Sequence, residues 1–311
     1  MNPKLDTFTL TYHIHTVMPY INWIYFFHAW GFPPRFAAIA DIHGCDSCRA
    51  SWLSTFPETE RARAAEAMQL HKDAIRMLNL LDEDFHTYVR FGLYEANADG
   101  NDLLLFDNAG QRSMRLPLLR QQQVRHDGGP CLCLSDFVRP IHKGERDIVG
   151  VFAGTVDSEI EHLYEEGNHA DEFKHLLCQT LADRLAEASV EKMHEEVRKN
   201  YWGYSPDEQF TPKELFRESY PGIRPAVGYP SLPDQSTNFE LNTWLDFSAI
   251  GIRLTETGAM LPHASVSGLI LAHPQAHYFA IGKIGEDQLV NYAQRKGKTP
   301  DEIRKYLTAN L

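Results

Sequence analysis

Four of the five cysteines stand in two close pairs, a spacing at which thiolates can bind a metal ion or exchange disulfides. Cys45 and Cys48 form a C-x-x-C motif, and Cys131 and Cys133 lie further along the chain. Four thiolates would hold a tetrahedral zinc ion if the two pairs met in space. Alternation within a strand-like run instead makes Cys131 and Cys133 ordinary buried residues. We therefore predict no metal site and keep a metal or redox role for Cys45 and Cys48 as the alternative.

The sequence lacks the motifs that bind nucleotides through glycine-rich loops. It contains no G-x-G-x-x-G segment after a strand, no P-loop and no G-x-S-x-G nucleophile elbow. Asp41-Ile42-His43 begins like the D-x-H-x-x-G signature whose histidine ligates cobalamin, but Asp46 stands where that signature has glycine. We therefore predict neither a Rossmann fold nor a corrinoid-binding module in this chain.

A loop rich in proline and glycine carries one arginine, Arg224, between Gly222 and Pro230. Its composition disfavours regular secondary structure, so backbone groups are free to hydrogen-bond a ligand. A guanidinium on a stiff loop can bind a carboxylate through two hydrogen bonds. The alternative is a structural turn whose arginine caps a helix end. The segment between Leu254 and Gly268 is rich in small residues and also has two interpretations. Its backbone could approach a ligand closely, or it could be a loop packed tightly on a strand.

Polar side chains recur along one face of a helix that we predict from about His169 to Lys199. They stand opposite Leu181 and Leu185, and such a stripe is typical of a solvated helix face. Its members are Arg184, Glu187, Glu191, His194 and Arg198.

Hydrophobic periodicity predicts the elements that must position these residues. Besides the helix ending near Lys199, an amphipathic helix is expected from Pro57 through Leu81. Two short helices close the chain; Gly297 ends the first, and a capping box at Thr299 opens the second. Asp99-Gly100 joins the first two strand-like runs in a hairpin, and the mixed order of elements favours an α+β fold. The strand-like runs are Tyr88–Ala96, Leu103–Phe106, Cys131–Val138, Ile148–Ala153, Ile250–Leu254, Leu269–Ala272 and Tyr278–Ile284.

Composition limits the classes of partner. The 311 residues carry a formal net charge of -12, which disfavours general binding to nucleic acid or to an anionic membrane surface. The apolar stretch from Trp23 to Phe27 is too short to span a membrane. An odd number of cysteines argues against a disulfide framework, so we expect reduced thiols and a cytoplasmic location.

Short motifs follow one another in a distinctive order along nearly the whole chain. In this order they resemble the S-adenosylmethionine-binding activation domain of cobalamin-dependent methionine synthase. The motifs are Tyr20-Ile21-Asn22-Trp23, Asp136-Phe137-Val138, the segments Ala182–Ala188 and Val197–Tyr204, the R-P-A-x-G-Y-P loop at Arg224, the segment Ala264–Gly268, His273-Pro274 and the segment Tyr292–Gly297.

The resemblance implies an α+β, C-shaped fold with an antiparallel sheet and surrounding helices, and a ligand held in a shallow groove. Under this interpretation residues 1–311 form a single domain, of which 1–36 are the irregular N-terminal part. Pro19 and Pro33-Pro34 support the irregular start, because proline limits helices.

The family's functional residues can be carried over where this chain matches the motifs. Arg224 corresponds to the arginine that binds the methionyl carboxylate, and Ala226 to a backbone contact with the ligand. Tyr229 matches a tyrosine that meets the corrin ring. The remaining S-adenosylmethionine-binding residues that the resemblance implies are Tyr278, Phe279, Asn22, Glu187 and Glu218.

The chain also departs from the family pattern. Asn22 stands where the family has an acidic ligand, so a carboxylate that would pair with the ammonium group is replaced by a neutral amide. Val227 replaces a proline and Phe279 replaces a tyrosine. The segment from Cys45 to Phe56 resembles an insertion.

The function implied by the resemblance is reactivation of methionine synthase in trans. The chain would bind S-adenosylmethionine and support reductive methylation of cob(II)alamin to methylcobalamin, with no catalytic side chain of its own. Cobalamin would be carried by a cobalamin-binding module on another chain, and flavodoxin or a similar donor would supply the electron. The alternative is an S-adenosylmethionine-binding sensor or regulatory protein without reactivation activity, for which Asn22 is the best support.

Overall fold

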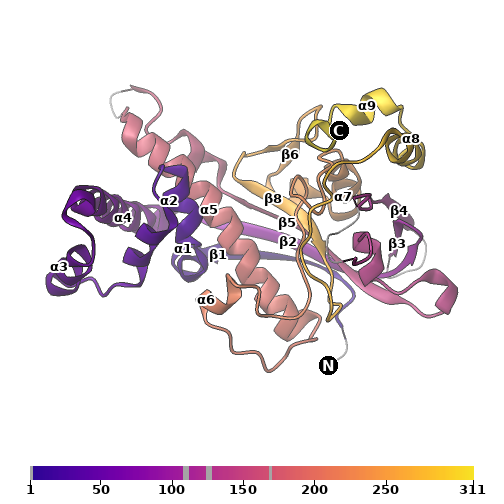
Figure 1. The fold of residues 1–311 in the computed structure, drawn as a ribbon, viewed down its shortest axis with the longest axis horizontal. Coiled ribbons are helices and arrows are strands. Elements are labelled where there is room, and N and C mark those ends of the chain that lie inside the picture. Colours follow the sequence, from indigo (N-terminus) through magenta and orange to yellow (C-terminus); the bar gives the residue numbers. More distant parts are fainter. Residues whose placement is uncertain (1–2, 108–111, 124–127, 168–169) are drawn as a thin grey trace.

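An antiparallel sheet forms the centre of the molecule (Figure 1). The computed structural model describes residues 3–107, 112–123, 128–167 and 170–311. The strand order is β4-β3-β2-β5-β8, and β1 pairs with β2 outside this path. The strands are β1 (Thr7–His13), β2 (His86–Asp99), β3 (Asp102–Phe106), β4 (Ser113–Pro117), β5 (Asp147–Val156) and β8 (Ser265–Ile270), with a separate pair of β6 (Arg253–Leu254) and β7 (Met260–Leu261).

The long strand β2 pairs with two different strands along one of its edges. Its first half pairs with β1 and its second half pairs with β3, while β5 runs along its other side. Side chains of β5 alternate between two cores, because successive residues of a strand point to opposite faces. Phe152 belongs to the core beneath the long helix α5, whereas Val151 and Ala153 belong to the core on the opposite face.

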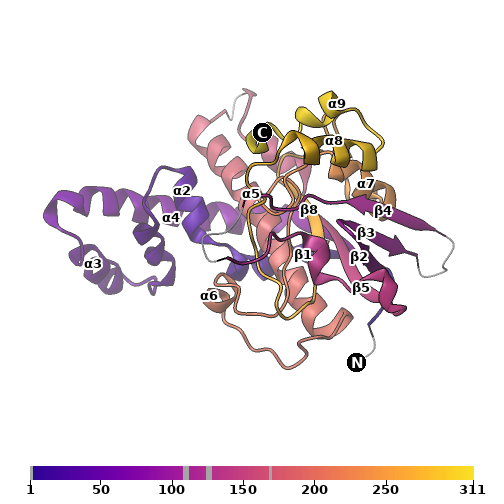
Figure 2. The same cartoon turned by 45° about the vertical axis from the view of Figure 1, so that its right-hand side comes forward.

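Helices cover both faces of the sheet and also extend beyond it. Helix α5 packs on β2, β5 and β8, and it approaches so closely that a Cβ at Gly154 would lie 2.4 Å from Val190 Cγ2. Helices α2, α3 and α4 form an arm that projects away from the sheet (Figures 1 and 2). The helices are α1 (Ile14–Val17), α2 (Trp23–Ala29), α3 (Asp46–Ser54), α4 (Glu58–Asp84), α5 (Glu172–Glu196), α6 (Pro212–Leu215), α7 (Thr237–Leu245), α8 (Glu286–Arg295) and α9 (Pro300–Arg304).

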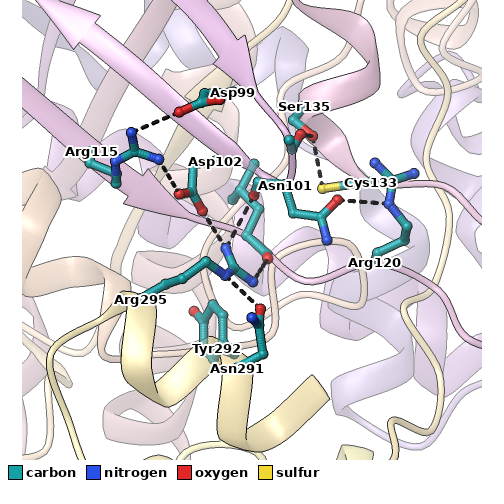
Figure 3. Close-up of polar contacts among 12 residues, drawn as sticks. Asp99, Asn101, Asp102, Arg115, Arg120, Cys133, Ser135, Asn291, Tyr292 and Arg295 are labelled. Carbon is teal, nitrogen blue, oxygen red and sulfur yellow. Dashed lines mark hydrogen bonds and ion pairs between the residues drawn. The ribbon is translucent and has the colours of Figure 1, made fainter. Parts of the chain in front are cut away.

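A polar network fastens the C-terminal helices to the β2–β3 hairpin (Figure 3). Asp102, at the start of β3, has a side chain only 4% exposed and accepts a hydrogen bond of 2.6 Å from Arg115. Arg295 on α8 pairs with the same carboxylate and donates to the Leu118 carbonyl at 2.9 Å. Two guanidinium groups thus neutralise one buried carboxylate, a case in which losing one partner is costly.

Most of the predicted elements are confirmed. The α+β class and the antiparallel sheet are present, and β2 and β3 form a hairpin tighter than expected, since Asp99 pairs directly with Asp102. Helix α4 begins after Pro57, and Thr299 forms the predicted capping box with Glu302. Helix α5 continues into a π-helical turn over Val197–Tyr201, and His169, its predicted start, lies outside the described residues.

Three structural predictions are wrong. The segment predicted to be irregular, 1–36, is not so over its described residues 3–36, because Thr7–His13 forms a strand on the edge of β2 and Trp23–Ala29 is helical between the prolines. Cys131–Val138 bends into a short 3₁₀ helix after a single bridge from Cys133 to Arg120. Tyr278–Ile284 forms no strand and pairs with none among the described residues; instead, Ile281 N–H donates to the Pro230 carbonyl and Ile284 N–H to the Asn310 carbonyl. The composition of this run is strand-like, but strand formation depends on distant pairing partners.

Two further strand runs are displaced. In Ile250–Leu254, Ile250 ends the 3₁₀ helix Phe247–Ile250 and only Arg253–Leu254 is a strand, β6. Leu269–Ala272 corresponds to the end of β8. Among the described helices, none is both long and apolar enough to cross a membrane.

Candidate functional site

A cavity of about 580 Å³ opens between α5, the N-terminal residues around α2 and three later loops. This volume lies in the range of small-molecule sites. All eight residues that the resemblance assigns to ligand or corrin contacts line this cavity, although they come from distant parts of the chain. They are Asn22, Glu187, Glu218, Arg224, Ala226, Tyr229, Tyr278 and Phe279.

One face of α5 supplies the floor of the cavity. Arg184, Glu187 and Glu191 are spaced by three and four residues, so their side chains lie on one face of the helix. The prediction that this polar stripe is a solvated face is wrong. His194 and Arg198, further along it, are fully buried, and Arg198 pairs with the buried Glu208 at 2.9 Å. The amphipathic pattern could not predict this burial, because a polar stripe that faces a charged cavity has the same sequence pattern as one that faces water.

The loop that carries Arg224 is held against the outer edge of β8. Ile223 and Leu271 exchange hydrogen bonds of 2.9 Å, and Val227 N–H donates to the Ser267 carbonyl at 2.8 Å. Gly268 makes this approach possible, since a Cβ there would lie 2.2 Å from the Pro225 carbonyl oxygen. For the passage from Leu254 to Gly268, tight packing of a loop on a strand is therefore the better interpretation.

The guanidinium of Arg224 sits between carboxylates at the cavity wall. Its side chain is 9% exposed, with Nη2 3.1 Å from Glu191 Oε2 and Nη1 4.0 Å from Glu187 Oε2. Burial alone would lower the pKa of Arg224, but the facing carboxylates, led by Glu191, hold it above its ordinary value. Arg224 Nε and Glu191 Oε1 are buried and have no hydrogen-bond partner among the described residues. Buried polar atoms of this kind are usually satisfied, so the pair has unused capacity for a ligand.

Tyrosines complete the positioning of the loop and of Glu187. The Arg224 backbone N–H donates to Tyr278 Oη at 2.9 Å, and the Tyr229 hydroxyl donates to Glu187 Oε1 at 2.6 Å. Tyr229 is 52% exposed and stands at the rim of the cavity, as does Tyr25, which is 60% exposed. Phe279 follows Tyr278 in the cavity wall, where its carbonyl accepts a hydrogen bond from Ser231.

Asn22 has a structural task at the cavity edge. Its side-chain Oδ1 accepts a hydrogen bond of 3.1 Å from the Ile24 N–H, so it is the N-cap of α2. Asparagine and aspartate are about equally good in this position. The amide therefore keeps the helix start that an acidic residue would provide, without the negative charge.

Glu218 enters the cavity from a strained backbone position. Its φ of 56° lies in the left-handed region, which costs free energy for a residue other than glycine. Burial and the like charge of Glu191 raise the pKa of Glu218, while Arg224 opposes the shift. A bound cation would favour the ionised form.

Several cavity residues were not assigned to the site from the sequence. Glu191 was assigned to a solvated stripe, and Tyr20, Tyr25 and Tyr220 received no role. The available signal was spacing, since Glu191 follows Glu187 by one helical turn and so must share its surroundings. For the tyrosines only the fold brings the segments together.

The two cysteine pairs do not form one zinc site. Cys133 is buried and accepts a hydrogen bond of 3.1 Å from Ser135, while the Cys131 thiol contacts the Gln123 carbonyl. All five cysteines are free. Among the described residues, Cys45 and Cys48 converge with His43, not with the second pair.

The arrangement suits a small ligand with both signs of charge. Three carboxylates (Glu187, Glu191 and Glu218) and two guanidinium groups (Arg184 and Arg224) face one cavity, giving it a negative balance. Arg224 provides a carboxylate partner, and the glutamates provide partners for cationic groups. Aromatic side chains around them add faces that attract cations.

Comparisons with known proteins agree with the motif order. Residues 13–297 match the family model described as "Vitamin B12 dependent methionine synthase, activation domain". A solved structure described as the MetH reactivation domain bound to AdoHcy is 35% identical in sequence, with a TM-score of 0.85. The match covers 100% of this chain and 93% of that one.

Proposed function

Because the chain belongs to the activation-domain family of vitamin B12-dependent methionine synthase, we propose that its cavity binds S-adenosylmethionine and presents the methyl group to a cobalamin carried on another chain. This would reactivate a methionine synthase in trans by supporting reductive methylation of cob(II)alamin to methylcobalamin. Cobalamin, when bound to its own module, supplies the cobalt that accepts the methyl group, and flavodoxin or a similar donor supplies the electron. With five free thiols, the chain is proposed to work in the cytoplasm.

The observation that carries the proposal is the pair formed by Arg224 and Glu191. Both side chains line the cavity, and each keeps one buried polar atom without a partner in the part of the chain that the structure describes. S-adenosylmethionine has a carboxylate, an ammonium group and a sulfonium group. Its carboxylate would engage Arg224, and its two cationic groups would be met by Glu187, Glu191 and Glu218. The net positive charge of the ligand complements the negative balance of the cavity.

The bound molecule of the solved relative supports the same ligand class. The MetH reactivation domain in that structure is bound to AdoHcy. It differs from S-adenosylmethionine by the transferred methyl group and its charge. We propose that Tyr278 and Phe279 lie on the adenosine side and that the backbone at Ala226 contacts the ligand, since all three residues line the cavity.

The rim of the cavity supports contact with a cobalamin-binding module. Tyr229 and Tyr25 expose half or more of their surface there, at 52% and 60%. Exposed aromatic residues around a hollow are typical of an interaction surface. The chain's own contribution to the reaction is then to hold the methyl sulfonium in place, a proximity effect that needs no nucleophilic side chain.

Calorimetric titration with S-adenosylmethionine tests the ligand. The wild-type chain should show saturable binding, and Arg224→Ala should weaken it about 30-fold or more, since removing one partner of a buried charge pair costs about 2 kcal/mol or more. Arg139→Ala is the matched control, because Arg139 pairs with Glu145 at the surface and does not line the cavity. Equal affinities for Arg224→Ala and the wild type would refute the assignment.

The second candidate is a sensor that binds the ligand without reactivating anything, which the neutral Asn22 favours. Reconstitution separates the two functions. The ligand-loaded chain is mixed with a cobalamin-loaded methionine synthase module and a one-electron reductant, and formation of methylcobalamin is followed by its absorption spectrum. Tight binding without methylcobalamin would establish the sensor.

A further inference from the structure

Three metal-ligating side chains converge on the loop that leads into α3, away from the cavity. His43, Cys45 and Cys48 place one imidazole nitrogen and two sulfur atoms within 4.8 Å of one another. The loop lies on the arm of α2, α3 and α4, which both ribbon views show projecting from the sheet (Figures 1 and 2). None of the three residues lines the cavity of the proposed ligand site.

Local structure fixes the position of the Cys45 sulfur. Cys45 is the N-cap of α3, and its Sγ accepts a hydrogen bond from the Cys48 N–H at 3.4 Å. The Cys45 sulfur is thereby fixed beside Cys48 at the first turn of the helix.

The three ligands are also reachable from solvent. Cys45 and Cys48 are half-buried, and His43 is exposed. Ligands of a tetrahedral zinc ion, with bonds of about 2.0 to 2.3 Å, lie within about 4 Å of one another, so small side-chain movements suffice.

We propose that His43, Cys45 and Cys48 form a binding site for a divalent, thiolate-preferring metal ion such as Zn²⁺, with a fourth coordination position open to water. Two thiolates and one imidazole match the ligand preference of zinc and differ from the oxygen ligands that Mg²⁺ and Ca²⁺ need. Two thiolates would also neutralise the charge of the ion.

A disulfide between Cys45 and Cys48 is the competing use of the same residues. A disulfide would not involve His43, although His43 lies next to both cysteines, whereas a metal ion would bind all three side chains. Oxidation would also remove both thiolates, so metal binding and disulfide formation exclude each other. This makes the thiol count of the protein part of the test.

Cobalt(II) serves as the spectroscopic probe. The full chain is reduced, freed of metal with a chelator, and titrated with Co²⁺ while its absorption is recorded. We expect a thiolate-to-cobalt charge-transfer band that saturates at about one equivalent, and Zn²⁺ should displace the cobalt and bleach the band.

Variants assign the ligands. Cys45→Ser and Cys48→Ser should each abolish the charge-transfer band, or leave half of it with a Co²⁺ affinity lowered at least 10-fold. His43→Ala should lower the Co²⁺ affinity at least 10-fold. Serine is a good N-cap, so Cys45→Ser keeps the start of α3 while removing a sulfur ligand. Cys131→Ser, a half-buried cysteine outside the cluster, is the control and should match the wild type.

Three outcomes would overturn the proposal. These are no charge-transfer band with both thiols reduced, a band of full strength and affinity in Cys45→Ser, or a thiol count showing that the pair re-forms a disulfide in the presence of excess Co²⁺. The readout is independent of S-adenosylmethionine, so its failure leaves the proposed function untouched.

Discussion

Asn22 couples two properties at one position, because it caps α2 and borders the cavity. Asn22→Asp should keep the cap and add a negative charge beside the ligand's ammonium group. We expect S-adenosylmethionine to bind about 10-fold more tightly, equivalent to about 1 to 2 kcal/mol, when measured by calorimetry.

Asn22→Ala is the control for the cap alone. It should lower stability by about 1 kcal/mol without any gain in affinity. An unchanged affinity in Asn22→Asp would mean that the ammonium group lies elsewhere.

Glu218 gives the site a pH dependence. Its pKa is raised by burial and by Glu191, so it is protonated at a higher pH than an ordinary glutamate. Affinity for the cationic ligand should fall as pH is lowered from neutral into the acidic range, because protonated Glu218 no longer attracts it. Calorimetry on Glu218→Gln should show weaker binding at neutral pH and a smaller fall.

The stability of the unliganded chain should change in the opposite direction. A carboxyl whose folded pKa is raised costs stability above that pKa, and the cost disappears as pH falls below the unfolded value. Glu218→Gln should therefore be slightly more stable than the wild type in urea at neutral pH and equal to it in acid. The gain in stability is small because Glu218 is largely exposed and its carboxyl only partly desolvated, so solvent screens most of the charge. A destabilised variant would contradict this account.

The sequence predicted which residues line the site, but it did not predict how their charges pair. The motif order pointed to eight residues, and all of them line one cavity. The ion pair between Arg224 and Glu191 could not be foreseen, because it depends on how the loop is laid against α5. Sequence identifies which groups are charged, whereas burial and pairing are set by the fold.

At the scale of elements, the loop of Arg224 depends on a glycine in the neighbouring strand. Gly268→Ala would place a methyl group 2.2 Å from the Pro225 carbonyl oxygen and 2.8 Å from Ala226 Cα, so the loop must move. We expect ligand affinity to fall at least 10-fold and the free energy of unfolding to fall by about 1 to 3 kcal/mol. Calorimetry and urea unfolding measure the two effects.

Gly44→Ala is the matched control. Its nearest neighbour would be the end of the Arg49 side chain at 3.7 Å, which is an ordinary contact. Unchanged affinity in Gly268→Ala would show that Arg224 does not depend on the pairing with β8.

Elements with strong internal periodicity were predictable, and elements that depend on distant partners were not. Helix α4 and helix α5 bury regular apolar stripes, so their spacing sufficed. Strand β1 alternates Phe8, Leu10 and Tyr12 with threonines, but the nearby prolines masked that signal. The stretch after Cys133 has strand-like composition yet bends, because Asp136 returns to cap the Cys133 N–H at 2.9 Å.

At the scale of the whole molecule, the C-terminal helices depend on a buried charge. Asp102→Asn would leave Arg295, whose side chain is 18% exposed, facing a neutral amide. We expect a loss of about 3 kcal/mol in urea unfolding, as for other buried pairs that lose one partner. Ligand affinity of the folded protein should be unchanged, because neither residue lines the cavity.

Arg304→Ala provides the comparison on the same C-terminal unit. Its pair with Glu286 has side chains 43% and 61% exposed, so the loss should stay below about 1 kcal/mol. Equal losses in the two variants would show that burial of Asp102 does not matter.

The order of the strands could not be predicted from the sequence. Mixed helices and strands indicated the α+β class, but β5 pairs with β2 and β8, which lie far before and after it in the chain. Such pairings are decided by packing across the whole sheet and leave no local pattern.

The loop laid along β8 has a consequence for solubility. A terminal strand of a sheet offers unpaired backbone groups that can recruit another chain, and proteins usually cover or blunt such an edge. Here Ile223, Pro225 and Val227 occupy that edge through their backbone hydrogen bonds. Substitutions that lift the loop would uncover β8, so the protein would begin to self-associate into aggregates while its helices were still intact.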